Sequence, residues 1–191
     1  RIGGTKKIKA DFIAKLQPDL IIGNKEENEQ EQIEALMGKY PVWMSDIQNL
    51  EQALDMIEQI GQITGKADRA NELGNQVRQS FGVLTPPGGS RPGVAYFIWR
   101  GPWMAAAKGT FIDDMLGKAG FRNVFKHLDR YPVITSEQLS AAKPGFILLS
   151  SEPYPFGEKH LEEFRNVCPE AVIVLVDGEL FSWYGSRLLQ S

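Results

Sequence analysis

An internal repeat constrains the fold of this 191-residue chain more than any other feature. Pro18 and Pro144 are 126 positions apart (144 minus 18), and Glu26 and Glu152 have the same separation (152 minus 26). The flanking residues also correspond, since "ADFIAKLQPDLIIG" parallels "SEQLSAAKPGFILL". Chance rarely gives one register at several positions, so we interpret the chain as two related halves.

Each copy predicts a helix, a strand, a loop, a helix and a strand in that order. Both quoted segments start with a short helical pattern that has an apolar face, and a β-rich run follows. Downstream, "QIEALMGKYPVWMSD" and "LEEFRNVCPEAVIVLVD" indicate a helix, a turn with proline, and a strand that ends at Asp46 or Asp177. This alternation predicts an α/β fold with two pseudo-repeated lobes and mainly parallel sheets.

The most helical stretch of the chain lies between the copies. Asn49 is suited to cap a helix whose apolar residues recur every three or four positions, and Gly65 separates it from a second helix over 66–84. The second helix, at about 1.5 Å per residue, would be about 28 Å long. The Pro/Gly-rich segment 85–93 then begins the second lobe. We therefore expect an N-terminal lobe at 1–64, a connecting backbone helix at 65–84 and a C-terminal lobe at 85–191.

The second lobe starts with a strand, "VAYFIW", and a helix, "TFIDDMLGKAG", that Thr110 and Asp113 can cap and Gly120 can end. The first lobe has no counterpart, because position 94 minus 126 falls before residue 1. We therefore expect the second lobe to hold at least one strand and one helix more than the first, which we interpret as incomplete at its N-terminus.

Composition excludes several classes of function. The 21 Lys and Arg residues against 24 Asp and Glu residues give a net charge of −3, which offers no strong field for nucleic acid or an acidic membrane surface. The apolar runs are far shorter than the roughly 20 residues that span a bilayer. Residues 1–10 show no signal peptide, although a trimmed chain would also lack one. Cys168, the only cysteine, excludes an internal disulfide, and we expect it to be buried.

Catalytic patterns are missing from the sequence. His127 and His160 have no metal-binding spacing, and we expect both on the surface. "GGTKK" and "GKAD" lack the phosphate-loop pattern, and "WYGSR" lacks the serine elbow of hydrolases. We therefore expect no catalytic residue, no metal site and no cofactor. An α/β enzyme with its catalytic residues outside this chain, and a sensor of the same fold, stay open as alternatives.

Five segments together resemble the cobalamin and ferric-siderophore substrate-binding proteins of ABC importers, and the cobalamin branch more closely. They are "IGGTKK", "PDLIIGNKEEN", "WRGPWMAAAKGTFIDDMLGKAGFRNVF", "LLSSEPYPFGEKH" and "VDGELFSWYGSRLL". The resemblance implies two lobes joined by a helical backbone, capture of a metal chelate in the cleft between them, and delivery to a membrane permease. It also implies a periplasmic or extracytoplasmic receptor, lipid-anchored in some members. Family members begin with a further strand and helix, in agreement with the incomplete first lobe.

Ligands of open α/β sheets bind beyond the carboxyl ends of the strands. The residues that we expect to contact the ligand are Glu26, Trp43, Trp99, Arg100, Glu152, Tyr154, Trp183, Tyr184 and Arg187. Alternatives stay open for three kinds of residue. The two glutamates could instead accept hydrogen bonds from the start of the next helix. The arginines could pair with carboxylates, Arg187 with Asp177 or Glu179, and a tryptophan could cap the core.

The balance of aromatic and charged residues at the expected strand ends favours cobalamin. A ferric siderophore gains from converging cations, and these loops offer chiefly Arg100 and Arg187. The aromatic side chains can instead bury the broad face of a corrinoid, with siderophore or haem as the alternative ligand. The resemblance also implies that one exposed glutamate on each lobe docks on the permease. The candidates are Glu29, Glu31, Glu158 and Glu162, for which a solvated helix face is the alternative.

Overall fold

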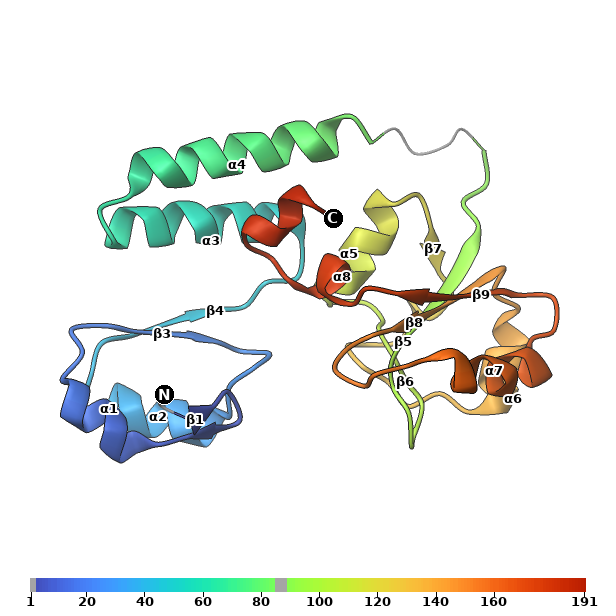
Figure 1. The fold of residues 1–191 in the computed structure, drawn as a ribbon, viewed down its shortest axis with the longest axis horizontal. Coiled ribbons are helices and arrows are strands. Elements are labelled where there is room, and N and C mark those ends of the chain that lie inside the picture. The colour runs from blue at the N-terminus through green and yellow to red at the C-terminus, as the bar shows by residue number, and fades with distance from the viewer. Residues whose placement is uncertain (1–2, 85–88) are drawn as a thin grey trace. The chain divides into compact units, whose positions relative to one another are not determined.

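The computed structural model of the chain describes residues 3–84 and 89–191 (Figure 1). Its contacts divide the chain into two compact units, unit 1 (Arg1–Asp46) and unit 2 (Ile47–Ser191). Helix α3 (Leu50–Ile63), which we expected in the N-terminal lobe, belongs to unit 2 by its contacts. The division into 1–64, 65–84 and 85–191 stays a prediction about the whole protein.

Unit 1 is a small α/β layer. Its elements are β1 (Gly3–Gly4), β2 (Lys7–Ile8), α1 (Ala10–Leu16), β3 (Ile21–Asn24), α2 (Gln30–Met37) and β4 (Val42–Ser45). Strands β1 and β2 are antiparallel, and β3 and β4 are parallel with Ile21 opposite Val42. Ile13 of α1 and Ile33 and Leu36 of α2 form the buried core. Both helices therefore cover the same face of the β3–β4 pair.

Unit 2 is built on a five-stranded sheet. Its elements are α3, α4 (Ala67–Gly82), β5 (Gly93–Trp99), β6 (Met104–Ala105), α5 (Phe111–Lys118), β7 (Arg122–Asn123), α6 (Ser136–Ala142), β8 (Phe146–Ser150), η1 (Glu158–His160), α7 (Leu161–Val167), β9 (Val172–Val176), α8 (Glu179–Ser182) and η2 (Ser186–Leu189). The strand order is β6-β5-β8-β9, with β7 also paired to β5. Strands β5, β7, β8 and β9 are parallel, and β6 is antiparallel to β5. The expected mainly parallel sheet is confirmed.

Helices cover both faces of this sheet. On one face, Leu139 of α6 and Phe164 of α7 pack against alternate residues of β5 and β8, with Cys168 buried beside them as expected. Burial also raises the pKa of the Cys168 thiol. On the other face, Ile112 and Leu116 of α5 pack against the intervening strand residues. The side-chain alternation of a strand thus produces two apolar faces, and each has its own helices.

Helices α3 and α4 lie side by side as a hairpin (Figure 1). The Asn49 side chain accepts a hydrogen bond from the Gln52 N–H at 3.0 Å and caps α3, as predicted. The break falls at the predicted position, and Gly65 has a φ of 66°. A Cβ at Gly61 would lie 2.3 Å from the Ala70 Cβ, so glycine allows the two helices to approach closely.

In the described parts of the chain, no helix has the length and apolarity needed to cross a membrane.

The structure confirms the repeat and shows where the copies differ. Helix α6 has the bounds of α1 shifted by 126, and the helices end at left-handed residues Gln17 (φ 47°) and Lys143 (φ 45°). Five residues separate Asn24 from α2 (25–29), whereas ten separate Ser150 from α7 (151–160). The second copy therefore has a longer connection after its first strand, and this connection includes η1. Unit 2 also holds β5 and α5, which have no counterpart among the described residues of unit 1, as predicted.

Candidate ligand-binding site

The carboxyl ends of β5, β8 and β9 lie together, because these three strands are parallel neighbours. The segments that follow them are 99–103, 151–156 and 177–185, and we call this surface the strand-end edge of unit 2. Seven of the expected site residues lie in or next to these segments. The edge is therefore the part of unit 2 that best fits a ligand site.

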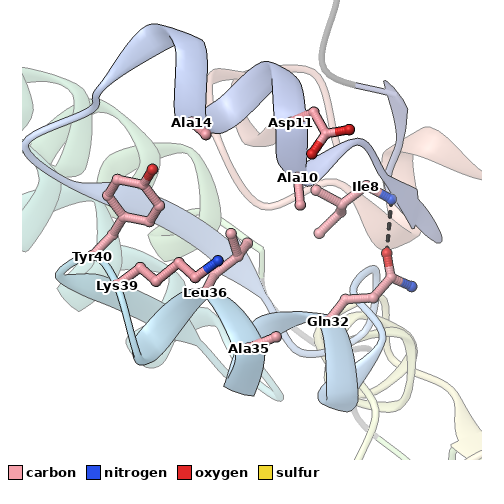
Figure 2. A pocket seen from close by; sticks show the side chains of 9 residues that line it. All are labelled: Ile8, Ala10, Asp11, Ala14, Gln32, Ala35, Leu36, Lys39 and Tyr40. Atoms are coloured by element: carbon pink, nitrogen blue, oxygen red, sulfur yellow. Dashed lines mark hydrogen bonds between the residues drawn. The ribbon is translucent and has the colours of Figure 1, made fainter.

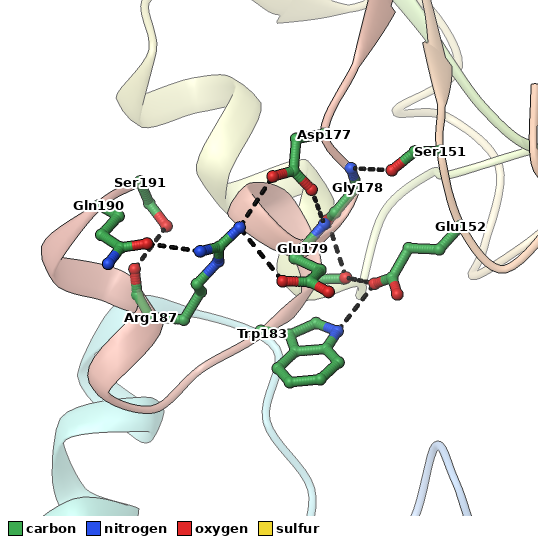
Figure 3. A network of polar contacts seen from close by, with 10 residues as sticks. Ser151, Glu152, Asp177, Gly178, Glu179, Trp183, Arg187, Gln190 and Ser191 are labelled. Atoms are coloured by element: carbon green, nitrogen blue, oxygen red, sulfur yellow. Dashed lines mark hydrogen bonds and ion pairs between the residues drawn. The ribbon is translucent and has the colours of Figure 1, made fainter. Parts of the chain in front are cut away.

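Glu152 is the centre of a polar network at this edge (Figure 3). Its Oε1 accepts a hydrogen bond from the indole N–H of Trp183 at 2.8 Å and lies 2.7 Å from the Ser182 hydroxyl. The expected alternative, that this carboxylate accepts hydrogen bonds from the N–H groups at the start of the next helix, is wrong, because its hydrogen bonds come from side chains. The carboxylate instead binds side chains of the segment that follows β9.

Buried hydroxyl groups hold the main chain of Glu152. Ser150 Oγ donates to the carbonyl oxygen of Glu152 at 2.6 Å, and it accepts the phenolic proton of Tyr96 at 3.1 Å. Both Ser150 and Tyr96 are almost completely buried. Burial, with smaller contributions from the charges of Glu152 and Asp177, raises the pKa of Tyr96 far above its usual value. The phenol therefore stays protonated and remains a donor to Ser150.

Gly178 allows the segment after β9 to approach the loop that carries Glu152. A Cβ at this position would lie 2.2 Å from Ser150 Oγ and 2.7 Å from Glu152 Cγ. The Gly178 N–H also donates to Ser151 Oγ at 3.0 Å (Figure 3). The sequence analysis missed this contact, because only the fold brings residue 178 to residues 150 and 152.

Trp99 and Tyr154 form a second aromatic group at the edge. Their rings meet edge to face with centroids 5.7 Å apart, and Trp99 is 40% exposed. The Tyr154 hydroxyl lies 3.1 Å from His160 Nε2, and His160 Nδ1 accepts from the Gly157 N–H at 3.0 Å. His160 is buried, so our expectation of a surface histidine is wrong here. Its ring packs edge to face against both Tyr154 and Phe156.

The arginines of the edge are engaged in ion pairs. Arg100 Nε bonds Glu163 Oε2 at 2.7 Å, and this bond raises the pKa of Arg100. Arg187 lies 2.8 Å from an oxygen of Asp177 and 3.1 Å from one of Glu179 (Figure 3). The alternative that both arginines pair with carboxylates is therefore confirmed, and a direct role in ligand binding stays a prediction.

The remaining aromatic residues near this edge divide into exposed and packed ones. Trp183 is 53% exposed, whereas Tyr184 packs edge to face on Phe111 with centroids 5.1 Å apart. Of these two adjacent aromatic residues, one is therefore exposed and the other is packed. Trp103 stacks on Phe164 at 4.5 Å, so this is the tryptophan that caps the core.

In unit 1, the expected site residues Glu26 and Trp43 do not lie together at a strand end. Glu26 follows β3, and its N–H donates to the Asn24 side chain at 3.0 Å. Trp43 lies within β4 opposite Ile22, on the face that α1 and α2 do not cover. We therefore keep both residues as predictions, with Trp43 placed on a sheet face and not at the end of a strand.

The four glutamates expected to dock on the permease are all exposed. Glu29 precedes α2, and Glu31 lies in its first turn. Glu158 starts η1, and Glu162 lies in the first turn of α7. Their exposure agrees with docking and equally with a solvated helix face.

A cavity of about 190 Å³ lies in unit 1 between α1 and α2 (Figure 2). Small side chains on both helices leave this space open, and Gln32 bridges one end by accepting from the Ile8 N–H at 2.8 Å. Its lining is Ile8, Ala10, Asp11, Ala14, Gln32, Ala35, Leu36, Lys39 and Tyr40. None of the expected site residues lies in this cavity.

Over 3–84 and 89–191 the structure shows no group of His, Cys, Asp and Glu side chains suited to hold a metal ion.

Two curated relatives that resemble this chain in sequence are vitamin B12-binding proteins. The vitamin B12-binding protein of Pectobacterium carotovorum is 23% identical over 195 residues, covering 99% of this chain and 70% of the relative. The vitamin B12-binding protein of Vibrio parahaemolyticus is 24% identical over 154 residues, covering 78% of this chain but only 56% of that protein. These relatives are binding proteins, which confirms the expectation of a binding protein instead of an enzyme.

A solved structure shows the same fold. The periplasmic haem-binding protein of Roseiflexus sp. RS-1 superposes with a TM-score of 0.82 at 23% identity, covering 100% of this chain and 78% of that one. A family profile described as periplasmic binding protein matches residues 1–173. Since this match includes nearly all of both repeat copies, the chain belongs to the periplasmic binding protein family.

Proposed function

We propose that this chain captures a metal-containing chelate, cobalamin in the first place, and delivers it to the permease of an ABC importer. The observation that carries the proposal is the pair of exposed tryptophans at the strand-end edge. Trp99 and Trp183 are 40% and 53% exposed. Trp99 ends β5 and Trp183 follows β9, which are the strands on either side of β8. Exposed rings in such a position supply apolar area for a broad planar ligand at about 25 cal/mol per Å².

The charges of the edge support a ligand with a largely uncharged face. Arg100 and Arg187 already pair with carboxylates, and Glu152 adds a further negative charge. An anionic siderophore or the carboxylates of haem would have to displace these partners, which costs part of the binding free energy. The vitamin B12-binding relatives agree with this choice, and the haem-binding structural neighbour makes haem the first alternative.

Calorimetric titration of the full-length protein with cyanocobalamin, haemin and a ferric siderophore tests the ligand. We expect saturable binding of cyanocobalamin, and Trp99→Ala should weaken it by roughly 1 to 3 kcal/mol, because it removes an exposed ring that supplies apolar contact area. Val172→Ala is a matched control, because Val172 is 53% exposed at the opposite, amino end of β9. Binding of haemin or the siderophore without binding of cyanocobalamin would overturn the choice of ligand.

We also propose an extracytoplasmic location and docking through Glu29 or Glu31 and through Glu158 or Glu162. The support is the family membership and the exposure of these side chains on helix starts. Charge reversal of Glu158 and Glu162 together should reduce uptake by the cognate importer without changing the ligand Kd. Unchanged uptake would contradict docking through these two residues and would favour the alternative that they only lie on a solvated helix face.

A further inference from the structure

Trp183 is exposed, yet a single directed bond holds its ring. The indole has one N–H, and this group donates to Glu152 Oε1 at 2.8 Å (Figure 3). The neighbouring Ser182 hydroxyl is 2.7 Å from the same oxygen and 2.8 Å from the Gly178 carbonyl oxygen, so its one proton is shared. The Trp183 N–H is therefore the principal donor to this carboxylate.

Glu152 can hold the indole because its own backbone is fixed from the core. The Tyr96 hydroxyl donates to Ser150 Oγ, which donates to the Glu152 carbonyl oxygen and accepts from the Glu152 N–H at 3.3 Å. This set of bonds uses the full hydrogen-bonding capacity of the Ser150 hydroxyl. A continuous series of bonds thus leads from buried Tyr96 to exposed Trp183.

We infer that Glu152 is a positioning residue that fixes the Trp183 ring for the ligand, and that it acts through Trp183 without contacting the ligand itself. Held in one orientation before binding, the indole loses less conformational entropy when a ligand stacks on it. The consequence for affinity rests on the proposed function, whereas the orientation of the ring does not. Two measurements therefore test the orientation of the Trp183 ring and its effect on affinity separately.

The first measurement needs no ligand. The full-length protein, labelled with ¹⁵N at tryptophan, should give one indole N–H signal for each of the four tryptophans of this chain, and Trp183→Phe identifies the signal of Trp183. We expect Glu152→Ala to shift this signal and to speed its proton exchange with water. Glu152→Gln retains an acceptor oxygen and should largely restore it. An unchanged Trp183 signal in correctly folded Glu152→Ala would overturn the inference.

The second measurement is a double-mutant cycle with cyanocobalamin as the probe. We expect Glu152→Ala to weaken binding about 3- to 10-fold, the scale for freezing one side chain on association. In the Trp183→Phe background the same change should have almost no further effect. Equal weakening in both backgrounds would mean that Glu152 contacts the ligand directly, and the inference would fail. If the parent binds no chelate, the proposed function fails, and the indole signal alone decides the role of Glu152.

Discussion

Replacing Gly178 with alanine tests whether the close approach of the segment after β9 to the Glu152 loop stabilises the strand-end edge. The added Cβ would lie 2.2 Å from Ser150 Oγ and 2.7 Å from Glu152 Cγ. Normal contacts between heavy atoms are about 3.5 Å or longer, so the loop has to move by about 1 Å. That movement would also lengthen the hydrogen bonds that Ser150 makes with Glu152.

The expected magnitude follows from two opposing contributions. Overpacking of a well-packed site costs about 1 to 3 kcal/mol. Gly178 has φ −62° and ψ −31°, which alanine adopts without strain, so a reduced entropy of the unfolded chain returns about 0.4 to 1 kcal/mol. We therefore expect Gly178→Ala to lower the free energy of unfolding by about 1 to 2 kcal/mol.

Urea unfolding followed by tryptophan emission measures this change. Of the four tryptophans of this chain, a Trp43→Phe background leaves Trp99, Trp103 and Trp183 as reporters, all within unit 2. The matched control is Gly157→Ala, because a Cβ there meets no atom within 4 Å and its backbone is extended. If Gly178→Ala is as stable as Gly157→Ala, the steric argument for this glycine is refuted.

Three further predictions concern the stability of unit 2. The raised pKa of Tyr96 means that at high pH the folded state keeps a proton that the unfolded state loses. The contribution of this group to the free energy of unfolding is therefore complete at neutral pH and is lost as the pH rises above about 10. Urea midpoints between pH 8 and 11 should fall more for the parent than for Tyr96→Phe, and parallel curves would contradict this. Thr135→Ala removes the reciprocal capping bonds with Gln138 at the start of α6 and should lower the free energy of urea unfolding by about 1 kcal/mol. The control Ser136→Ala should lower it much less, and equal losses would count against the cap. Arg187→Gln breaks two partly exposed ion pairs, so it should lower the free energy of unfolding by less than about 1 kcal/mol. This loss of stability should shrink in 0.5 M NaCl, which screens the charges. A loss that does not depend on salt would show that packing of the side chain dominates.

Much of the fold could be predicted from the sequence, because its periodic patterns and its repeat act locally. The cap of α3 at Asn49, the break at Gly65 and the strand in "VAYFIW" each depend on a few neighbouring residues. The assignment of α3 to a compact unit depends instead on distant contacts, such as those of Leu54 and Val77 with Phe111 and Met115 in its core cluster. Sequence periodicity contains no information about such contacts.

The candidate site was less predictable for the same reason. Trp99, Glu152 and Trp183 could be selected as residues after strands, but the bond between Glu152 and Trp183 joins positions 31 apart. The packing of His160 could not be recognised, because its partners Tyr154 and Phe156 enclose it only when the loop folds back. A lone histidine in a polar-looking segment carries no signal of burial.

The repeat itself shows why equal register does not imply an equal role. In unit 1 the short loop after β3 is closed by its own asparagines, since Asn24 Oδ1 accepts from the Glu26 and Glu27 N–H groups and Asn28 Oδ1 accepts from the Asn24 N–H. In unit 2 the connection from β8 to α7 is five residues longer and includes η1, and Glu152 bonds side chains of the segment after β9. Glu26 and Glu152 each stand two residues after their strand, so the length of the loop does not distinguish them. The difference is the segment after β9, which supplies the Ser182 hydroxyl and the Trp183 indole that bond Glu152. The contacts of a repeated glutamate therefore depend on the segment that it meets and not on its register in the repeat.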